Sequence, residues 1–255
     1  RTGIQKQPYN TIYQLMALKK KNPSLLEQAK KLLMMPDYFH WRLCGCAATE
    51  YTEATTGQLV SPKTKDWDYE LIDRLGYPRE IFQRIVPPGT VLGGLLPEIQ
   101  KEVGYDCQVA VPASHDTGSA VIAVPGEGEN VLYISSGTWS LMGTELLKAD
   151  CSEESRRRNL TNEGGYDYRF RYLKNIMGLW MIQSVKKEIG EELSFGRICE
   201  MAAGCDIKSI VDCNDDRFLA PDNMTGEVQS ACRESGQQVP EGIAEVACVI
   251  FNSLA

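Results

Sequence analysis

The stretch VAVPASHDTGSAVIAV, residues 109–124, sets Ser114, His115 and Asp116 side by side between an apolar run and a run of small residues. Its apolar half, which extends back to CQVAVPA at 107–113, predicts a buried strand. The half from Ser114 onward predicts a helix that Ser114 or Asp116 would cap. A buried strand that leads directly into a helix is typical of an α/β fold, which binds ligands at the carboxyl ends of its strands.

The three polar residues of this stretch do not form a hydrolytic triad. Consecutive side chains point in different directions on a strand or a helix, so Ser114, His115 and Asp116 cannot form a relay with one another. The serine also lacks the G-x-S-x-G turn of a hydrolase nucleophile. Asp116 would lie at a helix N-terminus, where the helix dipole favours the carboxylate. It is a candidate general base, with helix capping as the alternative.

Composition and charge exclude several classes of partner and location. The 255 residues are 43% hydrophobic and 24% charged, which is enough for a full core. A net charge of -7 argues against nucleic-acid binding. No apolar run reaches the length of a membrane span, and the chain opens without a signal peptide. The nine cysteines show no metal-binding spacing, so we expect reduced, mostly buried thiols in a cytoplasmic protein.

Local signals divide the chain into segments. Residues 1–85 are expected to be mainly helical, with a break between two helices at Asn22-Pro23. PPGTVLGGL at 87–95 predicts a turn before a short strand, and PGEGEN at 125–130 predicts a domain boundary. The chain begins with Arg rather than Met and ends in the apolar helical pattern VACVIFNSLA without a stop signal, so both ends look cut.

A second candidate site lies in SSGTWS, residues 135–140. VLYISSGTWSLMGTE predicts a hairpin around Ser136-Gly137. Small residues at the bend would let backbone N–H groups and the Thr138 hydroxyl approach an anion such as a phosphate. A plain hairpin turn is the alternative.

The stretch NEGGYDYRFRYLKNIMGLWMIQ, residues 162–183, is expected to pass from strand into a long helix that ends at Gly190. On that helix Asn175 and Gln183 would lie about 80° apart in azimuth and about 12 Å along the axis, and could line a groove of ligand length. The apolar side chains there are expected in the core, and the acidic pair of NDDRF is expected at a turn. These are Met177, Trp180, Met181, Asp215 and Asp216.

Several motifs together resemble the FGGY family of carbohydrate kinases. They are TGIQ, YNTIYQL, MPDYFHWRLCG, EYTEATTGQL, ASHDTGSAV, SSGTWSLMG, NEGGYDYRFRYLKNIMGLW and NDDRF, in the order of the family. The resemblance implies an α/β, actin-like ATPase (ribonuclease-H-like) sugar kinase with two domains, incomplete at both ends. The implied domains are the later part of a sugar-binding domain at 1–124 and the early part of a nucleotide-binding domain at 125–255.

The same resemblance implies an activity and its residues. We expect ATP-dependent phosphorylation of L-rhamnulose at its C1 hydroxyl, with another ketose or polyol, or a non-catalytic sugar-binding fragment, as alternatives. Asp116 matches the catalytic base and a sugar contact, His115, Thr117 and Asn175 match sugar contacts, and Thr138 and Gln183 match ATP positions. Mg²⁺ would accompany ATP, with unknown ligands. The family's N-terminal phosphate loop and C-terminal adenine site have no counterpart here, so residues 1–255 alone are expected to be inactive.

Overall fold

The computed structural model describes residues 1–125, 131–190 and 193–255, and these divide into two compact units. Unit 1 comprises Arg1–Tyr133 and Gly143–Lys174, and unit 2 comprises Ile134–Met142 and Asn175–Ala255. Most of the predicted boundary PGEGEN, residues 126–130, lies outside the described residues. The predicted division into domains 1–124 and 125–255 therefore stays a prediction.

The first 85 residues of unit 1 are mainly helical, as predicted. α1 ends at Lys21 and α2 begins at Pro23, so the predicted break at Asn22-Pro23 is confirmed. Proline suits the first turn of a helix because an N–H at that position has no partner within the helix. The helices here are α1 Thr11–Lys21, α2 Pro23–Gln28, α3 Met35–Cys44, α4 Tyr51–Thr56 and α5 Tyr69–Leu75.

Short strand pairs complete this part of unit 1. β1 (Thr49–Glu50) pairs in parallel with β2 (Ile85–Val86), and β3 (Val91–Gly94) pairs antiparallel with β4 (Gln108–Ala110). α6 (Pro97–Val103) connects β3 to β4. The expectation of a fully buried β4 is wrong, because only the middle residue of its three is buried. An antiparallel strand can face solvent on one side, and alternating burial is the result.

The core of unit 1 gathers apolar side chains from its helices and the segments between them. Tyr51, Leu59, Ile72 and Ile81 are at most 1% exposed. The Trp67 indole packs edge-on against Phe82, with 5.0 Å between ring centroids. Because Tyr51 begins α4, this helix is anchored in the core at its first residue.

A four-stranded sheet in the order β5-β6-β8-β7 follows in sequence. The predicted hairpin around Ser136-Gly137 is confirmed, since β5 ends and β6 begins on either side of Gly137-Thr138 and the two strands are neighbours. The strands are β5 Leu132–Ser136, β6 Trp139–Leu146, β7 Thr161–Gly164 and β8 Phe170–Met177, with α8 Glu153–Arg157 and η2 Tyr166–Tyr168 between them.

β7 packs closely on α4 at Gly164. A Cβ added to Gly164 would lie 2.8 Å from Cε1 and 2.9 Å from Cδ1 of the fully buried Tyr51 ring. The Gly164 N–H also donates to the Thr55 hydroxyl at 2.7 Å. A glycine at this position therefore lets the strand approach the helix.

Gly164→Ala is expected to destabilise the chain by about 1–3 kcal/mol, because the rigid Tyr51 ring cannot move aside. Urea unfolding would measure the change. Gly196→Ala is the matched control, since the nearest atom to an added Cβ there is the Ser194 Oγ at 3.9 Å. An undiminished free energy of unfolding for Gly164→Ala would contradict the close packing of β7 on α4.

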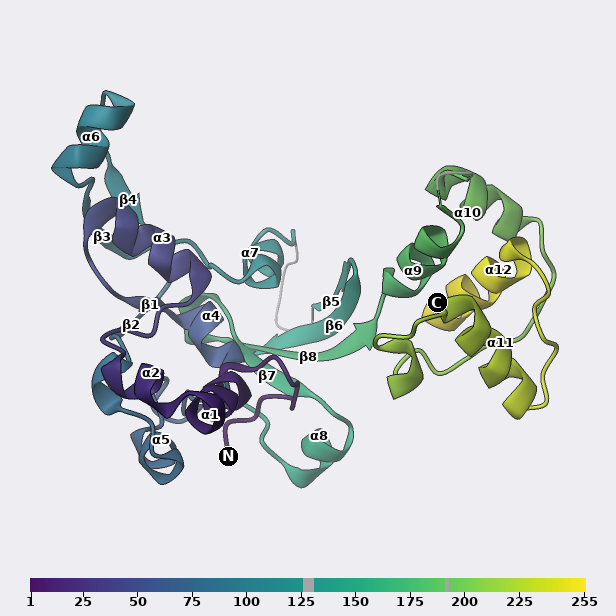
Figure 1. Cartoon of the computed structure of the whole chain (residues 1–255), viewed down its shortest axis with the longest axis horizontal. Helices are drawn as coiled ribbons and strands as arrows, with labels where there is room; N and C mark the ends of the chain where they lie inside the picture. Colours follow the sequence, from purple (N-terminus) through teal and green to yellow (C-terminus); the bar gives the residue numbers. More distant parts are fainter. Residues whose placement is uncertain (126–130, 191–192) are drawn as a thin grey trace. The chain divides into compact units, whose positions relative to one another are not determined.

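Unit 2 is a helical body that follows β8 (Figure 1). Met177 and Met181 lie in its core at 4% and 0% exposure, and Trp180 packs against the same cluster, as predicted. Asp215 caps the short helix that begins at Asp216, which confirms the expected turn. The elements are α9 Trp180–Glu188, α10 Phe195–Ala203, η4 Asp216–Phe218, α11 Met224–Glu234 and α12 Ile243–Leu254.

All nine cysteines carry free thiols. Cys107, Cys151 and Cys199 are exposed and only three others are fully buried, so the expectation of mostly buried thiols is wrong. Within the described residues, no helix is long and apolar enough to cross a membrane.

Candidate functional site

The segment that carries Asp116 leaves β4 as an extended loop and enters α7 (Asp116–Ile122). The residue at the N-cap is His115, whose side chain makes no capping bond. The prediction that Ser114 or Asp116 caps this helix is therefore wrong. Ser114 comes one position too early, and Asp116 is already the first residue of the helix.

The Asp116 carboxylate is held at one oxygen and open to solvent at the rest of the group. Its side chain is 97% exposed. Oδ1 accepts the Thr117 N–H at 2.6 Å and the Thr117 hydroxyl at 3.3 Å. Both bonds use the same oxygen, so Oδ2 keeps its acceptor capacity for a hydroxyl group of a ligand. Thr117 is itself buried, so its two hydrogen bonds fix the orientation of the Asp116 carboxylate.

His115 is partly buried beside Asp116, with 22% of its side chain exposed. Its Nδ1 lies 3.6 Å from Asp116 Oδ1, too far for a hydrogen bond, and has no hydrogen-bond partner among the described residues. Burial lowers the pKa of His115, and the positive charge of Arg171 adds to the effect. The imidazole is therefore neutral at neutral pH, and its contact with Asp116 is not an ion pair.

A buried ion pair in the same unit was not found by sequence reasoning. Glu163 on β7 and Arg171 on β8 are opposite each other in the register, and Arg171 is 0% exposed. Arg171 Nε donates to the Gly164 carbonyl at 2.9 Å, and its Nη2 lies 3.1 Å from Glu163 Oε2. That contact is not aligned as a hydrogen bond, so both atoms remain unsatisfied. A Glu and an Arg on the two sides of the Gly164-Gly165 turn would have been the signal, since they can pair across neighbouring strands.

Unsatisfied buried polar atoms gather in unit 1. Besides His115 Nδ1 and the Glu163–Arg171 pair, they include the hydroxyl groups of Tyr51 and Tyr133. Buried polar groups normally have partners, so these positions are suited to water or to a polar ligand. Arg171 and Glu163 act electrostatically on both His115 and Tyr133, which places the charges near both side chains.

Glu53 is a further acid near Asp116 that the sequence analysis missed. Burial raises its pKa, and the negative charges of Glu50 and Asp116 raise it further. The acids Glu50, Glu53 and Asp116 therefore concentrate negative charge in this part of unit 1.

Unit 2 holds the predicted ATP residues Thr138 and Gln183, and the structure brings them together. The Thr138 hydroxyl lies at the turn between β5 and β6 and donates to Gln183 Oε1 on α9 at 3.4 Å. The Thr138 carbonyl accepts the N–H groups of Gly178 and Trp180 at 3.2 and 3.1 Å. The hairpin turn is thus fixed against the beginning of α9.

Gly178 makes this contact possible. A Cβ on Gly178 would lie 2.6 Å from the Gly137 carbonyl oxygen and 2.7 Å from the Ser140 nitrogen. Both are backbone atoms that cannot give way to a side chain. The hairpin turn and the residues just before α9 are therefore packed backbone to backbone.

Asn175 is not on a helix with Gln183, so the predicted helical groove between them is wrong. Asn175 belongs to β8, which ends at Met177, and Gln183 belongs to α9, which begins at Trp180. Asn175 lies in unit 2, whereas His115, Asp116 and Thr117 lie in unit 1. The grouping of Asn175 with these three residues stays a prediction.

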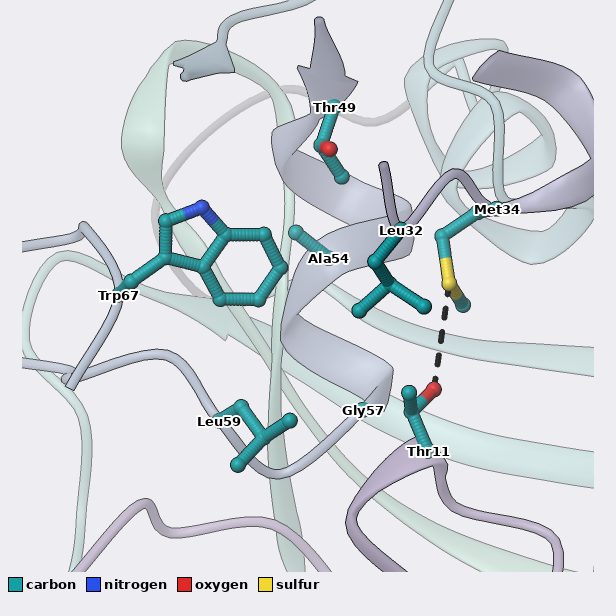
Figure 2. Close-up of a pocket in the computed structure, with 8 residues that line it drawn as sticks. All are labelled: Thr11, Leu32, Met34, Thr49, Ala54, Gly57, Leu59 and Trp67. Atoms are coloured by element: carbon teal, nitrogen blue, oxygen red, sulfur yellow. Dashed lines mark hydrogen bonds between the residues drawn. The ribbon is translucent and has the colours of Figure 1, made fainter. Parts of the chain in front are cut away.

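Two pockets of unit 1 lie apart from the predicted site. Figure 2 shows the smaller one, where Trp67, Leu32, Leu59 and Met34 enclose an apolar interior of about 10 Å³, about the space of one water molecule. The larger, of about 350 Å³, lies between residues 1–6 and several residues between 150 and 160. Neither is lined by a predicted site residue.

Comparison with known proteins finds both a family model and named relatives that this chain resembles. Residues 1–123 match the model of the N-terminal domain of the FGGY family of carbohydrate kinases. Residues 1–123 thus carry an N-terminal domain of the FGGY type. It is also similar over its whole length to proteins named rhamnulokinase, with 54% identity over 254 residues to that of Oceanobacillus iheyensis and 47% over 256 residues to that of Klebsiella pneumoniae subsp. pneumoniae. The chain spans 54% and 51% of these relatives, about half the length of the curated relatives it matches.

Solved structures of a gluconate kinase and a xylulose kinase share the fold of the chain. A gluconate kinase from Lactobacillus acidophilus aligns with a TM-score of 0.74 at 19% identity, over 100% of this chain and 52% of its own. A xylulose kinase from the same organism aligns with a TM-score of 0.70 at 21% identity, over 81% of this chain and 42% of its own. The predicted α/β, actin-like ATPase fold of a sugar kinase is thereby confirmed.

Proposed function

We propose that the protein carrying this chain phosphorylates L-rhamnulose with ATP and yields L-rhamnulose 1-phosphate. The observation that carries the proposal is Asp116, an exposed carboxylate held at one oxygen by the buried Thr117. The high identity to proteins named rhamnulokinase supports the choice of sugar within the family. The experiment that tests it is an ATP-consumption assay of the full-length protein with L-rhamnulose and other ketoses.

In this proposal Asp116 is the general base. Its carboxylate accepts the proton of the C1 hydroxyl as that oxygen attacks the γ-phosphorus of ATP, and ADP leaves in line with the attack. Neutral His115 and Thr117 bind sugar hydroxyl groups, and Asn175 contributes a further sugar contact. A neutral imidazole suits hydrogen bonding to a hydroxyl because it offers both a donor and an acceptor.

Thr138 and Gln183 are proposed to bind the phosphates of ATP. The shared site between the hairpin turn and α9 supports this, since it fixes a hydroxyl and an amide side by side. Mg²⁺ is expected to arrive with ATP. Among residues 1–125, 131–190 and 193–255, no group of three or more His, Cys, Asp or Glu could hold a metal ion.

Thr138→Val tests the ATP site. The change keeps the β-branched shape but removes the hydroxyl, so KM for ATP should rise about 2- to 10-fold, the worth of one hydrogen bond. KM for the sugar should stay within about 2-fold. Steady-state titration of each substrate in the full-length protein would measure both, with Thr144→Val on the adjoining strand β6 as the control. An equal loss for both substrates would indicate a distorted hairpin instead.

The location is cytoplasmic, and nucleic acid and membranes are not partners. Residues 1–255 alone are expected to lack turnover, because they span about half the length of the relatives named rhamnulokinase.

A further inference from the structure

The loop before Asp116 is tied to α4 by two buried side chains, Glu50 and Thr52, each 0% exposed. Glu50 caps α4, and its carboxylate accepts the N–H groups of Thr52 at 2.8 Å and Glu53 at 3.1 Å. The same carboxylate accepts the N–H of Ser114 at 3.1 Å, from a residue 64 positions later in the chain. One acid thus holds both the beginning of a helix and the loop.

Thr52 extends the same connection by one residue. Its hydroxyl donates to Glu50 Oε2 and accepts the His115 N–H at 3.2 Å. α7 approaches this side chain closely, since a Cβ on Gly118 would be 3.4 Å from Thr52 Cβ and Oγ1. The backbone N–H groups of the two residues before Asp116, Ser114 and His115, therefore donate to Glu50 and Thr52.

These bonds replace the ones that a strand or helix would supply. Ser114 and His115 lie between β4 and α7, outside both elements. Their N–H groups would otherwise need water or another backbone group. A bond from an N–H to a carboxylate is stronger than one to a neutral acceptor, and its burial strengthens it further. The conformation of the loop thus depends on α4 more than on its own neighbours.

We propose that Glu50 and Thr52 are positioning residues that hold the loop of Ser114 and His115, and through it the Asp116 carboxylate, in its reactive orientation. The inference rests on the proposed function, because it assigns Asp116 as the base. It adds a role for α4, whose side chains act on the reaction only through the backbone of the loop. Asp37 supports the arrangement, since its Oδ1 accepts the Glu50 N–H at 3.0 Å.

The test compares two changes at Thr52 in the full-length protein. Thr52→Val keeps the shape and removes the hydroxyl, whereas Thr52→Ser keeps the hydroxyl and removes a methyl group. Thr56→Val is the control, because its hydroxyl also lies on α4 but donates only to the Glu53 carbonyl. Glu50 itself is less informative, since its loss would also uncap α4 and prevent folding.

Thr52→Val is expected to lower kcat for the sugar about 10- to 100-fold, the effect of a misplaced catalytic group, with KM for the sugar within about 3-fold. Thr52→Ser should keep most of kcat even where its melting temperature falls, and Thr56→Val should keep all of it. Amide hydrogen exchange should quicken at Ser114 and His115 in Thr52→Val alone.

Equal losses of kcat in Thr52→Val and Thr52→Ser, in proportion to lost stability, would overturn the inference. Unchanged exchange at Ser114 and His115 in Thr52→Val would overturn it as well, because the anchor would then not exist. If the unaltered protein phosphorylates no sugar, the proposed function fails and the positioning role falls with it. Hydrogen exchange would still show in that case whether Thr52 anchors the loop.

Discussion

Asp116→Asn in the full-length protein is expected to lower kcat for sugar phosphorylation by about 10²- to 10⁴-fold, the usual worth of a general base. Asparagine keeps the size of the side chain and the oxygen that accepts the Thr117 N–H. It cannot accept a proton from the C1 hydroxyl of the sugar. KM for the sugar should therefore change little while kcat falls.

The measurement is steady-state kinetics of ADP release at saturating ATP. Asp106→Asn is a matched control, because Asp106 is an exposed acid in the loop before β4 and should leave kcat unaltered. An unchanged kcat for Asp116→Asn would limit Asp116 to a structural role at the beginning of α7.

Asp37→Asn is expected to remove a pH dependence of stability in unit 1. Asp37 is 2% exposed, and its Oδ2 has no hydrogen-bond partner among the described residues. Burial raises its pKa to about 7, the charges of Glu50 and Glu53 add to this, and backbone hydrogen bonds from Glu50 and Met34 oppose it only in part. The folded chain thus holds a proton that the unfolded chain has released.

The sign of the effect follows from that difference. The contribution of Asp37 to stability is fully present below about pH 4, where the unfolded side chain is also protonated, and is lost as the pH rises to about 7. Above pH 7 the unaltered protein should be less stable than Asp37→Asn by at most about 4 kcal/mol, at about 1.4 kcal/mol per pKa unit.

Urea unfolding of both proteins at about pH 4.5 and about pH 8 would measure this difference. These two conditions lie on either side of the folded pKa of Asp37, which is about 7. Asp73→Asn is the control of opposite sign, since the hydrogen bond from Arg79 lowers the pKa of that exposed acid. Parallel stability curves for Asp37→Asn and the unaltered protein would show that Asp37 is ionised in the folded state at both pH values.

The parts of the fold that were predicted correctly are set by the conformational preferences of single residues. Pro23 separates two helices because it suits a first turn, and Gly190 follows α9 with a positive φ of 68°. Gly137 and Thr138 allow the tight hairpin. Each of these signals acts within a few residues, so no tertiary information is needed to read it.

The wrong and missed predictions concern residues whose positions depend on contacts with distant parts of the sequence. Asn175 and Gln183 share a plausible helical spacing, but sheet pairing places Asn175 in β8. Glu50 binds a backbone group 64 residues away, and no local pattern reveals that bond. The site residues Asp116, His115 and Thr117 were expected from motif resemblance, whereas the buried, unpartnered Nδ1 atom of His115 needed the structure. A single sequence thus does not predict the contacts of residues whose positions depend on distant parts of the chain.

The central claim is that the protein carrying this chain is a kinase for L-rhamnulose, and the most direct measurement is ATP consumption by the full-length protein. L-rhamnulose, L-fuculose, D-xylulose and glycerol would be compared at equal concentration, with the phosphorylated product identified by NMR. The account predicts the highest kcat/KM for L-rhamnulose and a phosphate on its C1 oxygen. A higher kcat/KM for another of these compounds, or no ATP consumption with L-rhamnulose, would contradict it.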